Sequence, residues 1–207
     1  MYSCTFTKTL NLESSEKIII ILGNSSCGKS STARSLQSLL ANKNRPYVLL
    51  SVDGFNDILP TQWTSRGDKK EGLMFHKTND KNGPKITPII GRHTAYVRAK
   101  VFPTANIIVN DEIGVIIEGV VSNLELKNGI QEINRGKVTT VLIDCSLKVA
   151  QEREKKRGGE FIGLARGVLE EFPLPGSDDV DITINTDKIS MKDAAKKIYT
   201  QIFTPTP

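Results

Sequence analysis

A glycine-bounded loop at residues 23–30 has the residue types and spacing needed to hold a phosphate chain. It matches the pattern G-x-x-x-x-G-K-[ST] in full, and the matching residues are Gly23, Asn24, Ser25, Ser26, Cys27, Gly28, Lys29 and Ser30. The glycines let the backbone curl, so that successive N–H groups face a concavity backed by the positive end of the following helix. Lys29 would contact the β- and γ-phosphates, and the Ser30 hydroxyl would ligate Mg²⁺. We therefore expect this loop, together with Ser31, to bind ATP and Mg²⁺.

Carboxylates that follow apolar runs could supply acid–base and metal chemistry. The carboxyl ends of parallel strands meet in a common crevice, where ligands bind. Asp53 follows such a run and is the candidate general base, taking the proton of an acceptor hydroxyl in line with the γ-phosphate. Asp111 and Glu112 follow another run, and Asp111 is the candidate ligand of Mg²⁺. The alternatives are a helix-capping role for Asp53 and a turn-forming role for Asp111.

A basic segment could form a lid over the triphosphate. Arg153 and Arg157 lie on a charged helical stretch that ends in two glycines, and Arg166 follows. Guanidinium groups fit phosphate geometry, and on a closing segment they would stabilise developing charge and exclude water. We expect a lid at about residues 153–172, in which Arg153 and Arg157 bind the nucleotide and assist catalysis. The alternatives are a solvated helix face, which we assign to the neighbouring lysines, and a nucleic-acid patch.

Three further side chains have more than one interpretation. Cys27 lies at a helix N-terminus, which lowers the pKa of a thiol, so we hypothesise that it is sensitive to oxidation. Trp63 could line the cleft or simply pack against its neighbours. His93 could approach the acceptor cleft or have a structural role.

The order of apolar patterns indicates strands alternating with helices. A continuous apolar run predicts a buried parallel strand at 17–22, and further strands are predicted at 47–52, 107–109, 138–144 and 181–185. Helical spacing predicts helices after residue 28 and at 92–102, 124–135, 147–157 and 191–203, with Pro103 ending the second. The turn signal Asn82-Gly83-Pro84 predicts a β-hairpin excursion at about residues 60–90. The alternation is typical of a single α/β domain, here residues 1–207.

The composition narrows the class of protein. Of 207 residues, 38% are hydrophobic and 25% charged, which is a soluble globular balance. The net charge of +5 suits a phosphorylated ligand, and the lack of a basic stripe with interleaved aromatics disfavours nucleic acid. Three cysteines without a CxxC pair and two histidines argue against a disulfide framework or a zinc site. No apolar run is long enough for a membrane span or signal peptide, so we expect a cytoplasmic protein.

Two stretches of the sequence, residues 20–31 and 51–60, have patterns typical of a known family, and the second, with its V-D-x-x-x-x-x-x-P pattern, is the more distinctive. In these two stretches the chain resembles the chloramphenicol phosphotransferase-like family of P-loop kinases. The resemblance implies that Asp53 activates the acceptor, that Lys29 and Ser30 hold phosphate and magnesium, and that Arg153 and Arg157 are lid cations. The chain departs from the family at Asn110, which replaces the first of two aspartates after a hydrophobic strand.

We predict a P-loop kinase fold of the α/β class. It has a five-stranded parallel sheet in the nucleotide-kinase order, helices on both faces, a β-hairpin excursion and an arginine-bearing lid. The predicted reaction moves the γ-phosphate of ATP to a hydroxyl of a small molecule. One alternative is another kinase on the same fold, zeta-toxin-like or adenylylsulfate-type, with a nucleotide-type acceptor. The others are a nucleotide-binding switch without transferase chemistry and a nucleic-acid kinase or binder.

Overall fold

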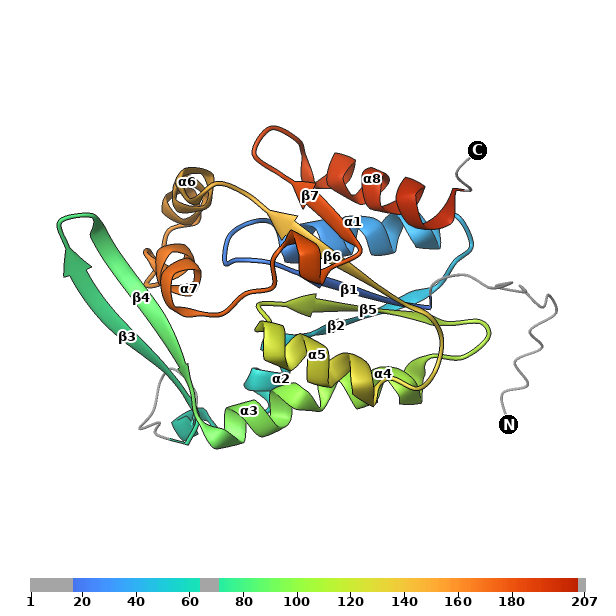
Figure 1. Ribbon diagram of the computed structural model, residues 1–207, viewed down its shortest axis with the longest axis horizontal. Coiled ribbons are helices and arrows are strands. Elements are labelled where there is room, and N and C mark those ends of the chain that lie inside the picture. The colour runs from blue at the N-terminus through green and yellow to red at the C-terminus, as the bar shows by residue number, and fades with distance from the viewer. Residues whose placement is uncertain (1–16, 64–70, 205–207) are drawn as a thin grey trace.

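The sheet lies between two layers of helices (Figure 1). The computed structural model describes residues 17–63 and 71–204, and in this part of the chain five parallel strands have the order β2-β5-β1-β6-β7. The strands are β1 Ile18–Leu22, β2 Tyr47–Ser51, β5 Gly114–Gly119, β6 Val138–Asp144 and β7 Ile182–Asn185. The predicted α/β class, the five parallel strands and the helices on both faces are confirmed.

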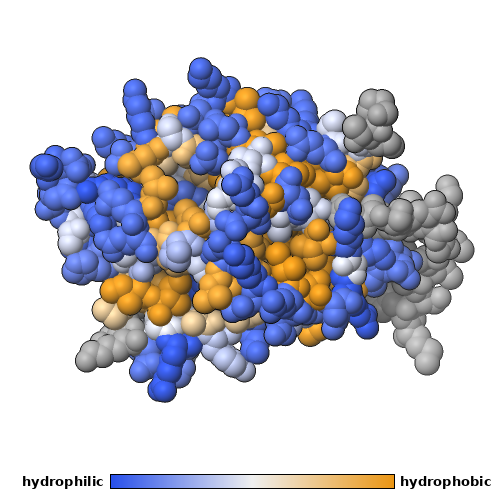
Figure 2. Space-filling model, viewed as in Figure 1, coloured by the Kyte–Doolittle hydropathy of each residue, from blue (hydrophilic) through white to orange (hydrophobic). Residues whose placement is uncertain are grey.

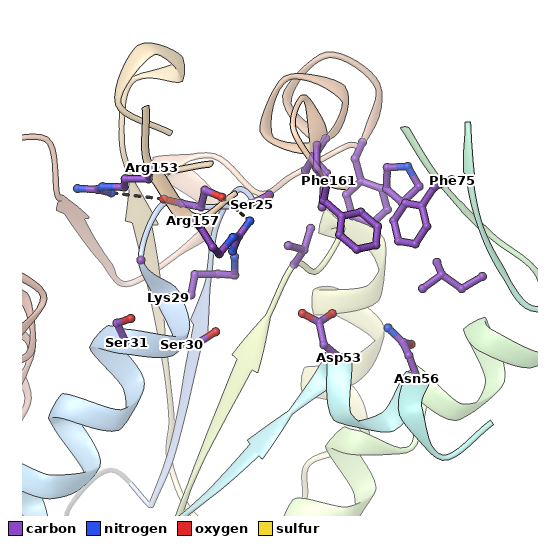
Figure 3. A pocket seen from close by; sticks show the side chains of 18 of the residues that line it. Ser25, Lys29, Ser30, Ser31, Asp53, Asn56, Phe75, Arg153, Arg157 and Phe161 are labelled. Carbon is purple, nitrogen blue, oxygen red and sulfur yellow. Dashed lines mark hydrogen bonds between the residues drawn. The ribbon is translucent and has the colours of Figure 1, made fainter. Parts of the chain in front are cut away.

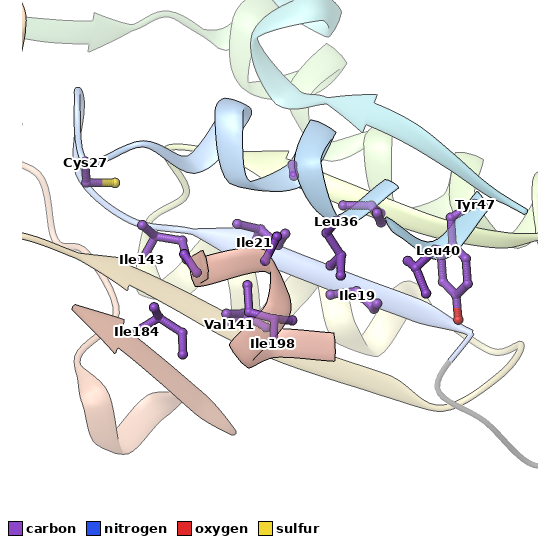
Figure 4. Close-up of a cluster of buried hydrophobic side chains, with 14 residues drawn as sticks. Ile19, Ile21, Cys27, Leu36, Leu40, Tyr47, Val141, Ile143, Ile184 and Ile198 are labelled. Carbon is purple, nitrogen blue, oxygen red and sulfur yellow. The ribbon is translucent and has the colours of Figure 1, made fainter. Parts of the chain in front are cut away.

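The central strand β1 explains why the sheet forms where it does. All five of its residues are buried, and their side chains alternate between the two faces. Ile19 and Ile21 join the hydrophobic cluster under α1 and α8 (Figure 4), and Ile18 and Ile20 join the cluster under α4 and α5. Each fully buried isoleucine stabilises the fold by about 1.5–3 kcal/mol. The run of isoleucines therefore fixes β1 at the centre, and the phosphate loop starts where it ends.

The helices have the following bounds in the described residues. They are α1 Lys29–Ala41, α2 Val52–Asp57, α3 Arg92–Ala99, α4 Val101–Ile108, α5 Asn123–Glu132, α6 Leu147–Arg157, α7 Leu164–Glu171 and α8 Met191–Phe203, with 3₁₀ turns at Thr61–Trp63 and Ser177–Asp179. The helices predicted at 147–157 and 191–203 are confirmed. None of the helices in the described ranges is long and apolar enough to cross a bilayer.

The third strand differs from the prediction. The run expected as a strand at 107–109 is the end of α4, and the strand beside β1 is β5. Pro103 is the third residue of α4, where the backbone N–H has no partner within the helix, so proline is tolerated and does not end a helix. Asp111 consequently comes before the third strand of the sheet rather than after it.

The predicted β-hairpin is present and stands out from the sheet (Figure 1). It consists of β3 Leu73–Asp80 and β4 Gly83–Ile90, which pair antiparallel, while residues 64–70 of the predicted excursion lie outside the described part. Its tip is hydrophilic, and hydrophobic residues gather nearer its base (Figure 2). The apolar part of the hairpin therefore lies close to the end of the sheet where the ligand site is expected.

Candidate active site

A cavity of about 620 Å³ lies at the carboxyl edge of the sheet (Figure 3). One end is polar and is lined by the phosphate loop, with Lys29 and Ser30, and by Asp53 of α2. The other end is apolar and is lined by the hairpin and the α6–α7 segment, including Phe75 and Phe161. The expected phosphate-binding and acid–base groups therefore share a cavity with a hydrophobic wall.

The phosphate loop needs its glycines for both conformation and space. Gly23 and Gly28 have φ angles of +146° and +102°, in the region that residues with a side chain rarely adopt. A Cβ at Gly23 would lie 2.1 Å from the Ile143 carbonyl oxygen, and one at Gly28 would lie 2.1 Å from the Met191 sulfur. Gly28 is also the N-cap of α1, so the loop curls directly into the positive end of that helix.

Lys29 lies over the loop in a position to meet a phosphate. It is 7% exposed, and its Nζ donates a hydrogen bond to the Asn24 carbonyl oxygen at 2.7 Å. Asn24 is itself fixed, because its Nδ2 donates to the Ala165 carbonyl oxygen and its Oδ1 accepts from the Ser25 N–H. A bound triphosphate would offer the ammonium group charged oxygens in place of a neutral carbonyl, which makes a stronger hydrogen bond.

Glu118 is the acidic residue that the structure brings to the loop. It lies near the carboxyl end of β5, is 5% exposed and accepts a hydrogen bond from the Ser30 hydroxyl at 2.8 Å. It pairs in register with Ile21 of β1 and Ser51 of β2, so it stands between the loop and the start of α2. The sequence carries a signal for it, since Val115 to Ile117 is an apolar run followed by a carboxylate.

Asp111 lies at the opposite edge of the sheet. Its carboxylate is fully exposed and accepts a hydrogen bond at 2.9 Å from Nζ of Lys17, the residue just before β1. That hydrogen bond lowers the pKa of Asp111. The expected position of Asp111 at a strand end is therefore wrong, and its geometry gives no support to a role as a magnesium ligand.

Asp53 is in the first turn of α2 and lines the cavity (Figure 3). The helix-capping position belongs to Ser51, which removes the capping alternative for Asp53. Within the described ranges, no hydrogen bond or ion pair engages the Asp53 carboxylate. It is exposed and in a position to accept a proton from a molecule in the cavity.

The two predicted lid arginines have different surroundings. The Arg153 guanidinium donates to the Cys27 carbonyl oxygen at 3.0 Å, to the Thr186 hydroxyl at 3.1 Å and to the Thr186 carbonyl oxygen at 2.7 Å. Arg157 is exposed, and its Nη2 donates to the Ser26 hydroxyl at 3.2 Å. Both line the cavity. Arg153 is hydrogen-bonded to the loop backbone, whereas Arg157 makes one hydrogen bond, to the Ser26 hydroxyl, among the described residues.

Arg166, the third lid candidate, binds the hairpin instead of facing the phosphate loop. It is 4% exposed, donates to both Asp80 carboxylate oxygens at 2.8 and 2.6 Å, and also bonds the Gly83 carbonyl and Glu170. The hydrogen bonds from Arg166 lower the pKa of Asp80 to about 2. The expectation that Arg166 closes over the triphosphate is wrong, because its donors bind the hairpin tip and Glu170 of its own helix.

The α6–α7 segment is joined closely to the hairpin along their length. The Ile86 N–H donates to the Gly163 carbonyl oxygen at 3.0 Å, and the Phe75 and Phe161 rings meet edge to face with centroids 4.9 Å apart. Glu154, 1% exposed, accepts the N–H groups at the start of α7 and fixes the corner between α6 and α7. The hairpin and the α6–α7 segment together form the apolar wall of the cavity.

The surroundings of Cys27, Trp63 and His93 decide between the interpretations that the sequence left open for them. Cys27 is 0% exposed, and burial raises the pKa of its thiol, which contradicts the hypothesis that it is sensitive to oxidation. Trp63 stacks on His93 with ring centroids 4.4 Å apart and an interplanar angle of 11°. Neither of these two rings lines the cavity, so both have a structural role in the described part of the chain.

The polar end offers the oxygen ligands that Mg²⁺ prefers. The Ser30 hydroxyl and the Glu118 carboxylate are in contact, and Asp53 lines the same cavity. Among the residues of known position, no group of three or more His, Cys, Asp and Glu side chains is placed to hold a metal alone. Mg²⁺ at nucleotide sites takes few protein ligands and completes its octahedron with phosphate and water, so this small oxygen set fits it.

Comparisons with known proteins agree with this geometry. Residues 16–202 match the sequence profile of a family described as chloramphenicol phosphotransferase-like protein, whereas no curated protein matches. A sugar kinase from Janibacter sp. HTCC2649 aligns with TM-score 0.61, 14% identity and coverage of 91% of this chain and 96% of its own. Mycobacterium tuberculosis APS kinase aligns with TM-score 0.58, 12% identity and coverage of 89% of this chain and 95% of its own. Acinetobacter baumannii shikimate kinase aligns with TM-score 0.57, 16% identity and coverage of 92% of this chain and 95% of its own. At these identities the solved structures show the fold, which is that of P-loop kinases.

Proposed function

The chain belongs to the chloramphenicol phosphotransferase-like family, and from that premise we propose that it transfers the γ-phosphate of ATP to a hydroxyl of a small molecule. Family and fold together support a P-loop kinase-type phosphotransferase. The observation that carries the finer proposal is the shared cavity, in which Lys29 and Ser30 stand at one end with Asp53 beside them. A phosphate held by the loop and a hydroxyl activated by Asp53 would meet inside it.

The proposed reaction is an in-line displacement at the γ-phosphorus. The loop N–H groups and Lys29 bind the β- and γ-phosphates, and Arg157 adds charge near the transferred group. Asp53 takes the proton as the acceptor oxygen bonds to phosphorus, and the bond to the β–γ bridging oxygen breaks to release ADP. Ser30 and Glu118 would hold Mg²⁺, which when bound neutralises charge on the phosphate oxygens. Exclusion of water by the apolar wall would favour transfer over hydrolysis.

The wall opposite the loop suggests the kind of acceptor. Phe75, Pro88 and Ile90 of the hairpin and Phe161 and Val168 of the lid line that side of the cavity. Hydrophobic lining with a few placed polar groups is typical of sites for small molecules with an apolar body. This composition favours such a hydroxyl compound over a nucleotide-sugar or a nucleic acid, both of which carry extended charge.

The test is a transfer screen with [γ-³²P]ATP and Mg²⁺ across chloramphenicol, other hydroxylated antibiotics, nucleosides and sugars. Wild-type protein should label at least one compound that has an apolar body. Asp53→Asn should lose transfer by at least about a hundredfold and keep ATP binding, because it removes the base and leaves the loop intact. Lys29→Ala should lose ATP binding in calorimetry.

A nucleotide-binding switch predicts a different result. It would show ATP binding that depends on Lys29, no labelled product with any acceptor, and no effect of Asp53→Asn on any activity. That combination would remove the proposal.

A further inference from the structure

Asn56 is a polar residue in the cavity to which the proposed reaction assigns no role. It lies on α2, three residues after Asp53, and both line the cavity. Residues three apart share a helix face, with about 5–6 Å between their Cβ atoms. Figure 3 shows both side chains rising from α2 on the same side, next to one another.

The Asn56 side chain is buried and incompletely bonded. The residue is 7% exposed, and its Oδ1 is inaccessible to solvent without a hydrogen-bond partner. Buried polar atoms in folded proteins are almost always hydrogen-bonded, because an unmet one is destabilising. A leucine has the same number of side-chain heavy atoms with the same branching, and it would not carry that penalty. The carboxamide lines the cavity, so rotation about its last side-chain bond would turn the unmet oxygen towards a bound molecule, which would then supply its partner.

We propose that Asn56 positions the acceptor by hydrogen-bonding a second polar group close to the hydroxyl that Asp53 activates. This inference rests on the proposed function of the site. A carboxamide has both donor and acceptor atoms, and rotation about its last side-chain bond exchanges them, so it can meet a hydroxyl or an amide. The short distance between the two side chains on α2 requires that second group to lie within a few bonds of the reacting hydroxyl.

Two probes isolate this contact. 1-Phenylethane-1,2-diol and 2-phenylethanol share a phenyl body and a primary hydroxyl, and only the diol has a second hydroxyl next to it. Transfer from ATP–Mg²⁺ to each is measured as kcat/KM with wild type, Asn56→Leu and Asn56→Ala. Thr94→Val is the matched control, because Thr94 is 0% exposed with an unmet Oγ1 but does not line the cavity.

Wild type should prefer the diol about tenfold, which is the effect of one hydrogen bond realised in the complex. In both Asn56 variants kcat/KM for the diol should fall to about the value for 2-phenylethanol, and kcat/KM for 2-phenylethanol should not change. The ATP affinity measured by calorimetry should also stay unchanged. Asn56→Leu should also melt at or above the wild-type temperature, which a structural role for the carboxamide would not allow. Thr94→Val should keep the full preference.

The two proposals fail in different ways. Equal use of both probes by wild type, or an undiminished preference in both Asn56 variants, overturns the role of Asn56 and leaves the phosphotransferase intact. If wild type transfers phosphate to no compound of the screen and to neither probe, both proposals are removed. Loss of the preference in Thr94→Val as well would assign the effect to general packing and overturn the inference.

Discussion

Gly167→Ala tests whether α7 is packed closely against the hairpin. Gly167 lies within α7, and a Cβ built on it would be 1.9 Å from the Ile86 carbonyl oxygen of β4. Alanine normally stabilises a helix relative to glycine by about 1 kcal/mol. Here we expect alanine to destabilise the protein instead, because the added methyl group would collide with the backbone of β4.

The size of the effect follows from the displacement that alanine requires. Ordinary contact begins near 3.4 Å, so α7 must move about 1.5 Å away from β4. That movement takes the Ile86 N–H to Gly163 carbonyl bond, 3.0 Å long, beyond hydrogen-bonding range. Overpacking costs about 1–3 kcal/mol and the lost hydrogen bond about 1 kcal/mol, against about 1 kcal/mol gained by the helix. The net loss is about 2 kcal/mol.

Thermal unfolding measures this loss, with Gly54→Ala as the control. Gly54 is also helical, but its Cβ would lie 3.6 Å from Ser51, which is an ordinary contact. For a chain of this length about 1 kcal/mol corresponds to about 2–4 °C, so Gly167→Ala should lower Tm by about 4–8 °C. Gly54→Ala should raise it by about 2–4 °C. A Gly167→Ala protein that melts at or above wild type, beside a stabilised control, would refute the close packing of α7 on the hairpin.

Two other predictions concern the acidic groups. Glu118→Gln keeps an oxygen for the Ser30 hydroxyl but removes the charge at the proposed Mg²⁺ site, so half-maximal transfer should need about tenfold more Mg²⁺. An unchanged Mg²⁺ titration would contradict that role. Arg166 lowers the pKa of Asp80 from 3.8 to about 2, so the pair stabilises the fold above about pH 4 and less as pH falls through 2. Urea unfolding of wild type and Asp80→Asn should therefore differ at pH 5 and converge near pH 2, whereas a constant difference would count against the pair.

The parts of the fold that local patterns determine were predictable. Strand 18–22 is a run of apolar residues long enough to be buried on both faces, strand 138–144 is rich in β-branched residues, and the helix at 191–203 has a clear apolar stripe. The third strand was not predictable, because two apolar runs, at residues 107–109 and 115–117, are each followed by an acidic residue. Pairing with β1 decides between them, and this depends on contacts across about a hundred residues of sequence. In the other run, Ile107 lies on α4 and is 83% exposed, which excludes it from a strand buried on both faces.

The candidate site shows the same division between local and long-range information. The phosphate loop is contiguous, so its pattern specified every member. Glu118 and Ser30 are 88 residues apart, and Arg166 and Asp80 are 86 apart, so the sequence gives no sign that either pair meets. The unmet oxygen of Asn56 is likewise a property of packing, since nothing in the residues 51–60 distinguishes a buried carboxamide from an exposed one.

The two arginines of α6 show why residue type alone does not assign a role. Arg153 and Arg157 are one helical turn apart and share a face. Moving Arg153 towards a phosphate would break its hydrogen bonds to Cys27 and Thr186, which join the back of the phosphate loop to the end of β7. Moving Arg157 would break one neutral hydrogen bond, to a serine hydroxyl that lines the same cavity. A triphosphate would therefore recruit Arg157 at little cost, while Arg153 is better suited to keeping the loop curled before the nucleotide arrives.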